Sequence, residues 1–504
     1  DYDELGNAYF VKAEDLEKYE PVERVYDAQG ALKKHAKGTF IYRLAGRNRE
    51  KSASYYTPEV LTRCVVKYAL KELLKDRSAD EVLDLTICEP ALGSGAFANE
   101  AVNQLAEAYL ERKARETGRT IPHDAMTLEK QKVKAFLADN RVYGADLNPV
   151  AIELAEISIW LNTIYAGHTI PWFGNQLAVG NSLIGARREV FHAQLLTDNA
   201  RAWLDSVPER VRLTETRREG YIYHFLAPDK GMAGYGDKLV KQMAGAEIET
   251  IAAWRKPFMK PFSSGEAKTL ERLSGAIDRL WLQHAEQRRR IRDLTKHTFP
   301  LFGKEDDPDF REMPKERRLT TRQKERIWRQ EVLSENVRNS SPYRRLKLAM
   351  DYWCALWFWP IDEAGLLPSR DEHLLDLTMI LEGGMLAAPE EPGQGNLFAD
   401  SVPREDYRKL LDQFGFVDID KLCREVPRLG VVKDVADHHR FLHWELEFAD
   451  VLRDRGGFDL IVGNPPWIKV QWNEAGLMGD YEPVFVLRKF SASKMDRLRE
   501  ETVK

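Results

Sequence analysis

The sequence predicts an α/β fold in which one parallel sheet is interrupted by a large, mostly helical insertion. Two strand–turn–helix units follow one another in the first part of the chain, at 82–110 and 142–163. Long polar helices fill residues 190–455, and a buried strand then returns at 458–463. Because strands that alternate with helices pair into parallel sheets, we expect the returning strand to belong to the sheet begun before the insertion.

The elements of the first half follow in order. Apolar residues recur at spacings of three and four after Pro58, which suits the first turn of a helix because proline lacks the N–H that would be unpaired there. Val82–Cys88 is expected to be a short strand, and a glycine-containing turn leads from it into a helix that begins near Ala96. Val142–Ala145 is the second expected strand, and the helix Val150–Thr163 follows it.

The same pattern divides the chain into four segments. Residues 1–50 are expected to form an N-terminal segment or linker, and residues 51–190 the first half of the sheet domain. Residues 191–455 are the insertion, and residues 456–504 return to the sheet domain. Helices of the insertion are expected at Glu266–Lys296, Thr320–Val337 and Tyr343–Phe358.

Charge limits the kinds of partner. The net charge of −5 argues against a chain covered in nucleic-acid-binding surface, although residues 266–347 hold 21 Lys and Arg against 14 Asp and Glu. Such a basic stretch suits a surface that faces phosphates, and it equally suits a solvated helix. The run Arg288–Arg290 is the strongest candidate for DNA contacts within it.

Targeting and metal-binding signals are missing from the sequence. No segment resembles a signal peptide or an apolar stretch long enough to span a membrane. The four cysteines are scattered, without metal-ligand spacing. We therefore expect a cytoplasmic protein with no membrane partner and no metal site.

The turn Glu89–Gly95 is the first candidate for ligand binding. Its glycines let the backbone approach a ligand and adopt positive φ, and the helix after it presents unpaired N–H groups. Asp146 ends the next strand, where a carboxylate can accept hydrogen bonds from both hydroxyls of a ribose. A P-loop is excluded because no Gly-Lys-Ser/Thr follows the turn, and a tight turn without a ligand is the alternative.

The tetrapeptide Asn464-Pro465-Pro466-Trp467 directly follows the returning strand. Two consecutive prolines fix the backbone and remove two N–H donors, so the carbonyl groups and the Asn464 side chain are held outward. The Asn464 side-chain oxygen and the Pro465 carbonyl can then accept hydrogen bonds from a planar amine, while Trp467 stacks on its ring. The tetrapeptide therefore predicts a site for an amino group on an aromatic ring.

The glycine turn, Asp146 and the Asn464 tetrapeptide, in the order in which they occur along the chain, resemble the motifs of the amino-methyltransferases of DNA. The arrangement is the one in which the cofactor motifs precede the catalytic motif. The resemblance implies a Rossmann-like fold, S-adenosylmethionine as cofactor, double-stranded DNA as partner, and methyl transfer to adenine N6 after the base is swung out of the duplex. The catalytic residues that it implies are Asn464, Pro465, Pro466 and Trp467. The cofactor-binding residues that it implies are Tyr56, Thr57, Pro58, Glu89, Pro90, Ala91, Gly93, Ser94, Gly95, Phe97, Asp146, Leu147, Asn181 and Ser182.

The stretch Phe441–Phe448 further resembles the large methyltransferases of type IIG restriction–modification and of the BREX and DISARM phage-defence systems. This resemblance implies other defence-system subunits as partners. Asn181 stands where Asp is commoner, and we expect this departure to weaken adenine binding. Only 37 residues follow Trp467, too few for further strands and a target-recognition domain, so the chain is expected to be a fragment or to be completed by a partner.

Other functions fit the same residues. Asn-Pro-Pro followed by an aromatic residue also serves amino-group methylation in protein and RNA. Cytosine N4 is an alternative target, although Ser is commoner before the prolines there. A non-catalytic, cofactor-binding scaffold of a defence complex fits the short C-terminal end, and a restriction nuclease would lie outside these residues.

Overall fold

The structure is a computed structural model that describes residues 9–39, 57–333, 341–383, 417–466 and 483–488, together with residues 490 and 494. The chain divides into two compact units, one formed by Asp1–Tyr55 with Pro466–Lys504 and the other by Tyr56–Pro465. Among the predicted site residues, Tyr56 and Trp467 lie outside the described residues.

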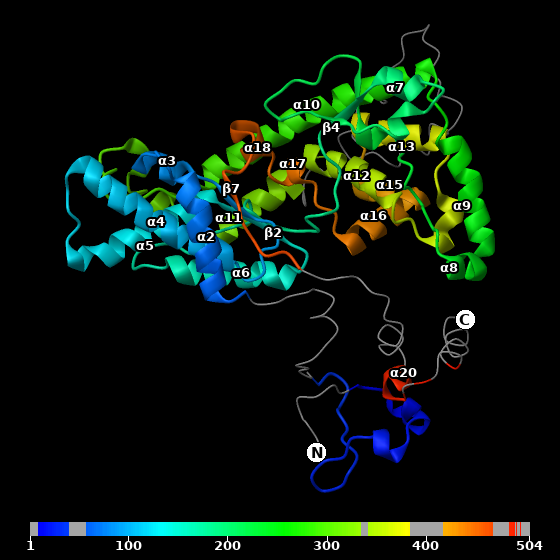
Figure 1. Cartoon of the computed structure of the whole chain (residues 1–504), viewed down its shortest axis with the longest axis horizontal. Helices are drawn as coiled ribbons and strands as arrows, with labels where there is room; N and C mark the ends of the chain where they lie inside the picture. Colours follow the sequence, from blue (N-terminus) through cyan, green and yellow to red (C-terminus); the bar gives the residue numbers. More distant parts are fainter. Residues whose placement is uncertain are drawn as a thin grey trace. The chain divides into compact units, whose positions relative to one another are not determined.

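A four-stranded parallel sheet lies in the larger unit (Figure 1). Its strands are ordered β3 (Leu177–Val179), β2 (Val142–Asp146), β1 (Ile87–Glu89) and β7 (Leu460–Ile461). Ile87 pairs with Val142 on one side and with Leu460 on the other, so the strand after the insertion lies next to the first strand of the sheet. The predicted α/β fold with a helical insertion is confirmed.

Four long helices of the first half share one hydrophobic core with the sheet. They are α2 (Glu59–Leu73), α4 (Ala96–Thr117), α5 (His123–Arg141) and α6 (Pro149–Thr163). At the start of α6 the Asn148 side chain accepts a hydrogen bond from the N–H of Val150 (3.1 Å), and Pro149 occupies the first turn. Local sequence therefore determines where the chain leaves β2 and enters the helix.

The strand predicted at Val82–Cys88 is wrong except at its last two residues. Ala79–Asp84 forms the short helix α3, and β1 begins only at Ile87. The cause is a capping box, in which the Ser78 side chain accepts from the N–H of Glu81 and the Glu81 carboxylate accepts from the N–H of Ser78 (2.7 Å). This pairing favours one helical turn that buries Val82.

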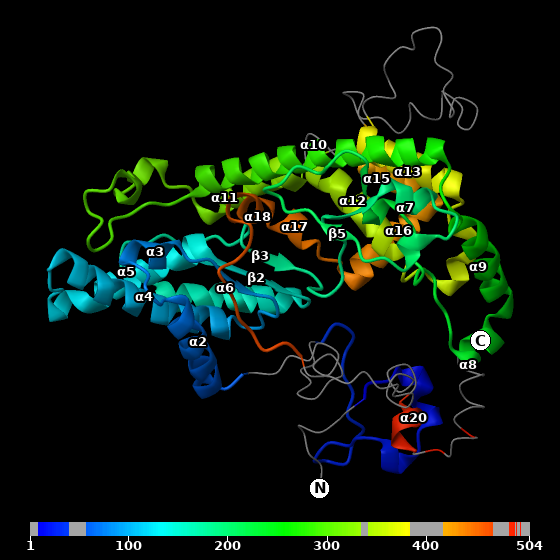
Figure 2. The same cartoon turned by 45° about the horizontal axis from the view of Figure 1, so that its top comes forward.

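The insertion is built around α10 (Ser264–Thr295), which Figure 2 shows as a single long helix. Its buried side chains recur at spacings of three and four and join one large core with neighbouring helices. These neighbours include α12 (Pro342–Ala355) and α13 (Arg370–Glu382), and α16 (Pro427–His439) packs against α12 in the same core. The predicted helix at 320–337 is divided: α11 spans Thr321–Trp328, and the π-helix Arg329–Leu333 follows it.

Shorter elements complete the insertion. The sequence did not predict its antiparallel sheet, ordered β5 (Glu209–Arg210), β4 (Glu189–His192) and β6 (Tyr221–Tyr223). The remaining helices are α7 (Ala193–Thr197), α8 (Lys238–Met243), α9 (Gly245–Phe258), α15 (Ile419–Glu425), α17 (Trp444–Glu447) and α18 (Ala449–Arg455). No helix within the described ranges has both the length and the apolar character needed to cross a bilayer.

The smaller unit brings residues from both ends of the chain together. It contains the 3₁₀ helices Ala13–Lys18 and Pro21–Glu23 and the short helix α20 (Val484–Leu487). The Arg488 guanidinium donates to both carboxylate oxygens of Glu23, and both donor–acceptor distances are 2.7 Å. This bidentate ion pair links the end of α20 to the N-terminal segment.

Candidate functional site

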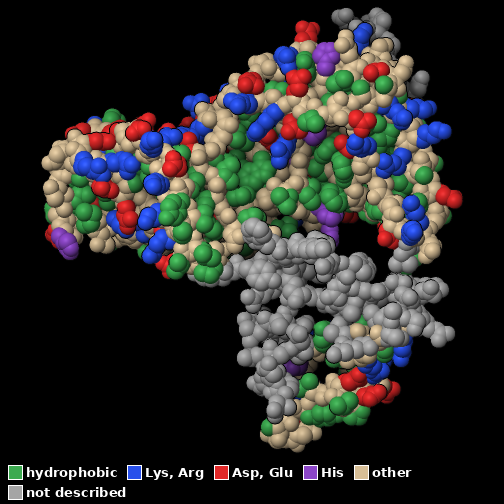
Figure 3. Space-filling view, in the orientation of Figure 1, with side chains coloured by type: hydrophobic (Ala, Val, Ile, Leu, Met, Phe, Trp, Pro, Cys, Tyr) green, Lys and Arg blue, Asp and Glu red, His purple; other side chains and the backbone are tan. Residues whose placement is uncertain are grey.

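The predicted site residues follow the carboxyl ends of neighbouring strands. The glycine turn follows β1, Asp146 ends β2, Gly180 follows β3 and Asn464 follows β7. Apolar side chains of this region are exposed, including Leu147 and Val179, and Figure 3 shows hydrophobic side chains gathered on this part of the larger unit. Because ligands of open parallel sheets bind at this edge, the topology brings the separate motifs to one candidate site.

Hydrogen bonds join the glycine turn to the end of β2. The N–H of Leu92 donates to the carbonyl of Ala145 (3.0 Å), and the N–H of Gly93 donates to Asp146 Oδ2 (2.8 Å). Gly93 has a φ of +54°, and a Cβ atom built on it would meet nothing within 4 Å. Gly95 has a φ of +74° and packs against Ala155 of α6, where a Cβ atom would lie 3.4 Å away. The turn therefore leaves open space at Gly93 and is anchored at Gly95.

Asp146 is half-buried and held from two sides. Its Oδ1 accepts from the N–H of Asn148 (2.8 Å), while Oδ2 accepts from the N–H of Gly93. A carboxylate offers about four lone-pair positions, so these two bonds leave acceptor capacity for the hydroxyls of a ribose. Leu147 follows immediately and is 44% exposed, so an exposed apolar side chain comes next to the carboxylate in the sequence.

Glu89 and Phe97, at the two ends of the glycine turn, are buried. Glu89 is 2% exposed, and its Oε2 accepts from the N–H of Ala98 (2.9 Å) at the start of α4. Burial raises the pKa of the Glu89 carboxyl well above its usual range, against the opposing effect of the Ala98 and Phe97 N–H groups. The structure thus gives Glu89 the role of holding the helix start. Among the other turn residues, Pro90, Ala91 and Ser94 are half-buried.

The turn after β3 is fixed by a segment from the end of the insertion, residues 440–444, which we name the docking strap. The Asn181 N–H donates to the Arg440 carbonyl (2.7 Å), and the Asn181 side chain accepts from the N–H of Leu183 (3.1 Å). Ser182 offers its carbonyl to the Trp444 ring N–H (3.0 Å). Sequence reasoning placed Asn181 and Ser182 beside a cofactor but did not foresee the strap.

The buried His443 side chain anchors the docking strap through hydrogen bonds. Its Nδ1 accepts from the N–H of Ala186 (3.0 Å), so the ring proton resides on Nε2, which lies 2.9 Å from Asp351 Oδ1. Lys347 completes the group through its own bond to Asp351 (2.8 Å). Burial would raise the pKa of Asp351, but Lys347 and His443 outweigh it and hold that pKa below its usual value. The turn beside β3 is therefore linked to the helical core of the insertion.

Gly185 is required by the same contact. A Cβ atom at this position would lie 2.0 Å from the backbone oxygen of Leu442, which neither partner can relieve by rotating a side chain. Gly185→Ala is expected to displace the docking strap and to destabilise the larger unit by about 1–3 kcal/mol, as overpacking does. Urea unfolding followed by circular dichroism measures the change in the free energy of unfolding. Gly236→Ala is the matched control, since a Cβ atom there meets nothing within 4 Å, and equal stability of the two variants would contradict the strap.

Asn464 and Pro465 stand at the end of β7 and are exposed. The Asn464 Nδ2 group donates to Thr57 Oγ1 (3.3 Å), one residue before Pro58 caps α2. Gly463 lies against the glycine turn, since a Cβ atom there would lie 3.6 Å from both Glu89 Cγ and Pro90 Cδ. Residues of the upstream motif and of the predicted catalytic motif, far apart in the sequence, thus meet through Thr57 and Asn464.

The prediction that the run Arg288–Arg290 faces DNA is wrong for Arg288. This side chain is buried in α10, where its Nε donates to Asp450 Oδ1 (3.1 Å) and its Nη2 to the carbonyl of Asn175 (2.9 Å). Arg289 and Arg290 are exposed. Helical periodicity explains the difference, because Arg288 lies on the face of α10 that turns toward the core and the next two residues turn away from it.

Comparison with known proteins identifies what this arrangement is similar to. The family described as Eco57I restriction-modification methylase matches residues 140–495. A putative type II restriction enzyme and methyltransferase of Methanocaldococcus jannaschii is 23% identical over an alignment of 193 residues. That alignment covers 28% of this chain and 15% of the relative, so the chain matches only a small part of that protein's length.

Proposed function

The chain belongs to the Eco57I restriction-modification methylase family, and we propose that it transfers a methyl group from S-adenosylmethionine to adenine N6 in double-stranded DNA. The observation that carries the proposal is the meeting of Asn464 with Thr57 at the sheet edge that also holds Asp146. We place the reaction in a cytoplasmic restriction–modification or phage-defence system, with further subunits as partners.

The residues present fit the cofactor. Asp146 would accept from the ribose hydroxyls, and the exposed side chain of Leu147 would lie against the adenine ring. The open space at Gly93 admits a ligand close to the backbone, and Thr57 and Pro58 would border the methionine part. When bound, S-adenosylmethionine supplies an electrophilic methyl group on a positively charged sulfur.

The protein's own contribution to the reaction is to position an amine. The bond from Asn464 Nδ2 to Thr57 orients the amide, and Oδ1 would be the atom that accepts from the substrate. Hydrogen bonds from the exocyclic NH₂ to Asn464 Oδ1 and the Pro465 carbonyl would draw the nitrogen toward tetrahedral geometry and align its lone pair. The same oxygens would stabilise the positive charge that develops on nitrogen, while Trp467 would hold the flipped base by stacking.

Sequencing of modified bases tests the function directly. Host DNA is compared between cells that express the gene containing this chain and cells that express its Asn464→Ala variant. We expect N6-methyladenine at one sequence motif, lost in the variant. N4-methylcytosine in its place would overturn the assigned base, and unmodified DNA in both samples would refute DNA methylation by this gene.

Asp146→Ala is expected to weaken S-adenosylmethionine binding about 10- to 100-fold, because charge-assisted hydrogen bonds to the ribose contribute about 1.5–3 kcal/mol. Isothermal titration calorimetry measures the dissociation constant. Asp205→Ala is the control, as Asp205 is an exposed partner of Lys230 in the insertion. Unchanged affinity in a folded Asp146→Ala protein would remove Asp146 from the site.

A further inference from the structure

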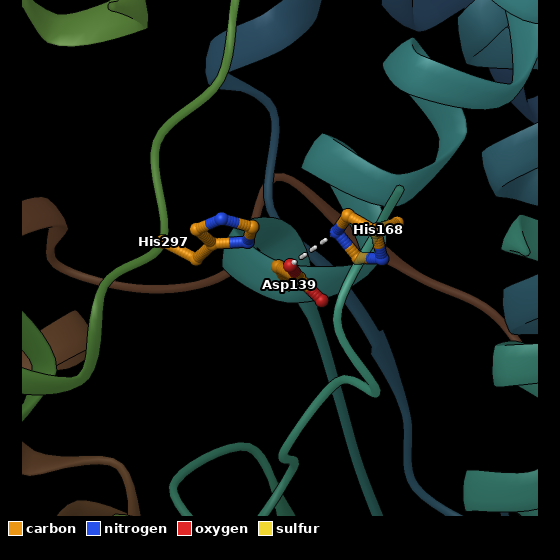
Figure 4. Close-up of side chains that lie close together, drawn as sticks. All are labelled: Asp139, His168 and His297. Carbon is orange, nitrogen blue, oxygen red and sulfur yellow. Dashed lines mark ion pairs between the residues drawn. The ribbon is translucent and has the colours of Figure 1, made fainter. Parts of the chain in front are cut away.

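Three potential metal ligands that are distant in sequence meet at the other end of β2 from Asp146. Asp139 lies in the last turn of α5, just before β2 begins; His168 follows α6, and His297 follows α10. Figure 4 shows Asp139 between the two imidazole rings. One carboxylate oxygen and one nitrogen from each ring all lie within 4.8 Å of one another.

Each of the three residues of this cluster has one buried polar side-chain atom without a hydrogen-bond partner. Twelve buried side-chain nitrogen or oxygen atoms in the described part of the chain have none, and three of them are Asp139 Oδ1, His168 Nε2 and His297 Nε2. The His168 side chain is 2% exposed and that of Asp139 is 12% exposed. Because an unsatisfied buried polar atom costs about 1–3 kcal/mol, three at one point indicate a missing partner.

The geometry favours a metal ion over a hydrogen bond as that partner. His168 Nε2 lies 3.4 Å from Asp139 Oδ2, which is long for a hydrogen bond. Two ligands of a tetrahedral zinc ion, each about 2.0–2.1 Å from it, stand about 3.4 Å apart. His297 Nδ1 is 3.3 Å from Thr169 Oγ1, and such a bond from the other ring nitrogen orients the rings of metal-binding histidines.

Burial disfavours the charged form of the His297 imidazole. Burial, with a smaller effect of His168, lowers the pKa of His297 to about 4. Two cations face the cluster: Arg318, which is paired with Glu312, and the buried Lys324, whose pKa burial lowers against the attraction of Asp139. Lys324 as the sole counter-ion of Asp139 is the competing interpretation, and it leaves both histidine Nε2 atoms without a partner.

We propose that Asp139, His168 and His297 bind a zinc ion as three protein ligands, with water in the fourth position. Two ligands belong to the first half of the sheet domain and the third to the insertion, so the ion would join the insertion to the sheet domain. The open edge of the sheet, where Asp146 and Asn464 lie, is not part of this site. The sequence predicted no metal because the ligands follow no short spacing.

Metal analysis of the purified full chain tests the proposal. After incubation with Zn²⁺ and gel filtration, mass spectrometry is expected to find about one zinc per chain, as a single site of three protein ligands and water requires. Asp139→Asn and His297→Gln should lose it, while the control His438→Gln, an exposed histidine of α16, should keep it. Zinc below a tenth per wild-type chain, or equal zinc in all four proteins, would overturn the site.

Two further measurements keep the test valid if a ligand variant fails to fold. The wild-type chain loaded with Co²⁺ should show the visible absorption of a tetrahedral ion, and a spectrum identical to free Co²⁺ would contradict the proposal. Removal of the metal by a chelator should lower the melting temperature of the wild type by several degrees and leave that of His297→Gln unchanged. Lys324→Met should tighten zinc binding by removing a repelling charge, whereas the competing interpretation predicts no zinc in this variant.

Discussion

Asn464→Ala is expected to slow methyl transfer at least about 10²- to 10³-fold while the S-adenosylmethionine dissociation constant stays within about twofold. The reason is that Asn464 Oδ1 would act on the amine only as charge develops, whereas we propose that the glycine turn after β1 and Asp146 at the end of β2 hold the cofactor. Single-turnover transfer of a tritiated methyl group to DNA that carries the modified motif measures the rate. Calorimetry on the same preparations measures cofactor affinity.

Two further variants are compared with Asn464→Ala. Thr57→Val removes the 3.3 Å bond that orients the Asn464 amide but leaves the amide in place, so a smaller loss of about tenfold is expected. Asn199→Ala changes an exposed asparagine of the insertion and should match the wild type. If Asn464→Ala kept the wild-type rate, the catalytic role would be refuted. If it lost cofactor affinity equally, Asn464 would belong to the cofactor site.

Features determined by local sequence were predicted well. The glycine turn, the end of β2 at Asp146 and the start of α6 after Asn148 follow from proline, glycine and capping residues within a few positions. The helix α10 was predicted to within two residues because its apolar period is sustained over 32 residues. The exception is α3, where the Ser78–Glu81 capping box overrides the β-like run that follows.

Features that depend on contacts between distant residues were missed. The docking strap depends on the hydrogen bond between Ala186 and His443, and the proposed zinc ligands come from three separate segments. Neither feature produces a short sequence motif from which it could be predicted. Two glycines in the sequence could have indicated the strap. Gly180 and Gly185 flank the turn, and a Cβ atom at either position would collide with Leu442. Burial of Arg288 depended on Asp450, a partner that only the folded chain brings near.

Asp450→Ala is expected to destabilise the larger unit by about 3–5 kcal/mol, the usual effect of removing one partner from a buried ion pair. Asp450 of α18 is 1% exposed and accepts from Arg288 Nε (3.1 Å) and Arg292 Nη1 (2.8 Å). Without it, the buried Arg288 charge keeps the carbonyl of Asn175, next to β3, and the face of the Trp328 ring, but no carboxylate among its described partners. Because α18 leads directly into β7, the damage should reach the strand that carries Asn464.

Urea unfolding of three variants separates this pair from surface electrostatics. Asp454→Ala removes only the outer, partly exposed partner of Arg292 and should cost less than about 1 kcal/mol. The double variant Arg288→Met/Asp450→Leu removes both charges and should recover most of the stability, since the penalty comes from the uncompensated guanidinium and not from the lost attraction. A double variant as unstable as Asp450→Ala would instead show that α10 and α18 depend on the ion pair itself to dock the insertion against the sheet.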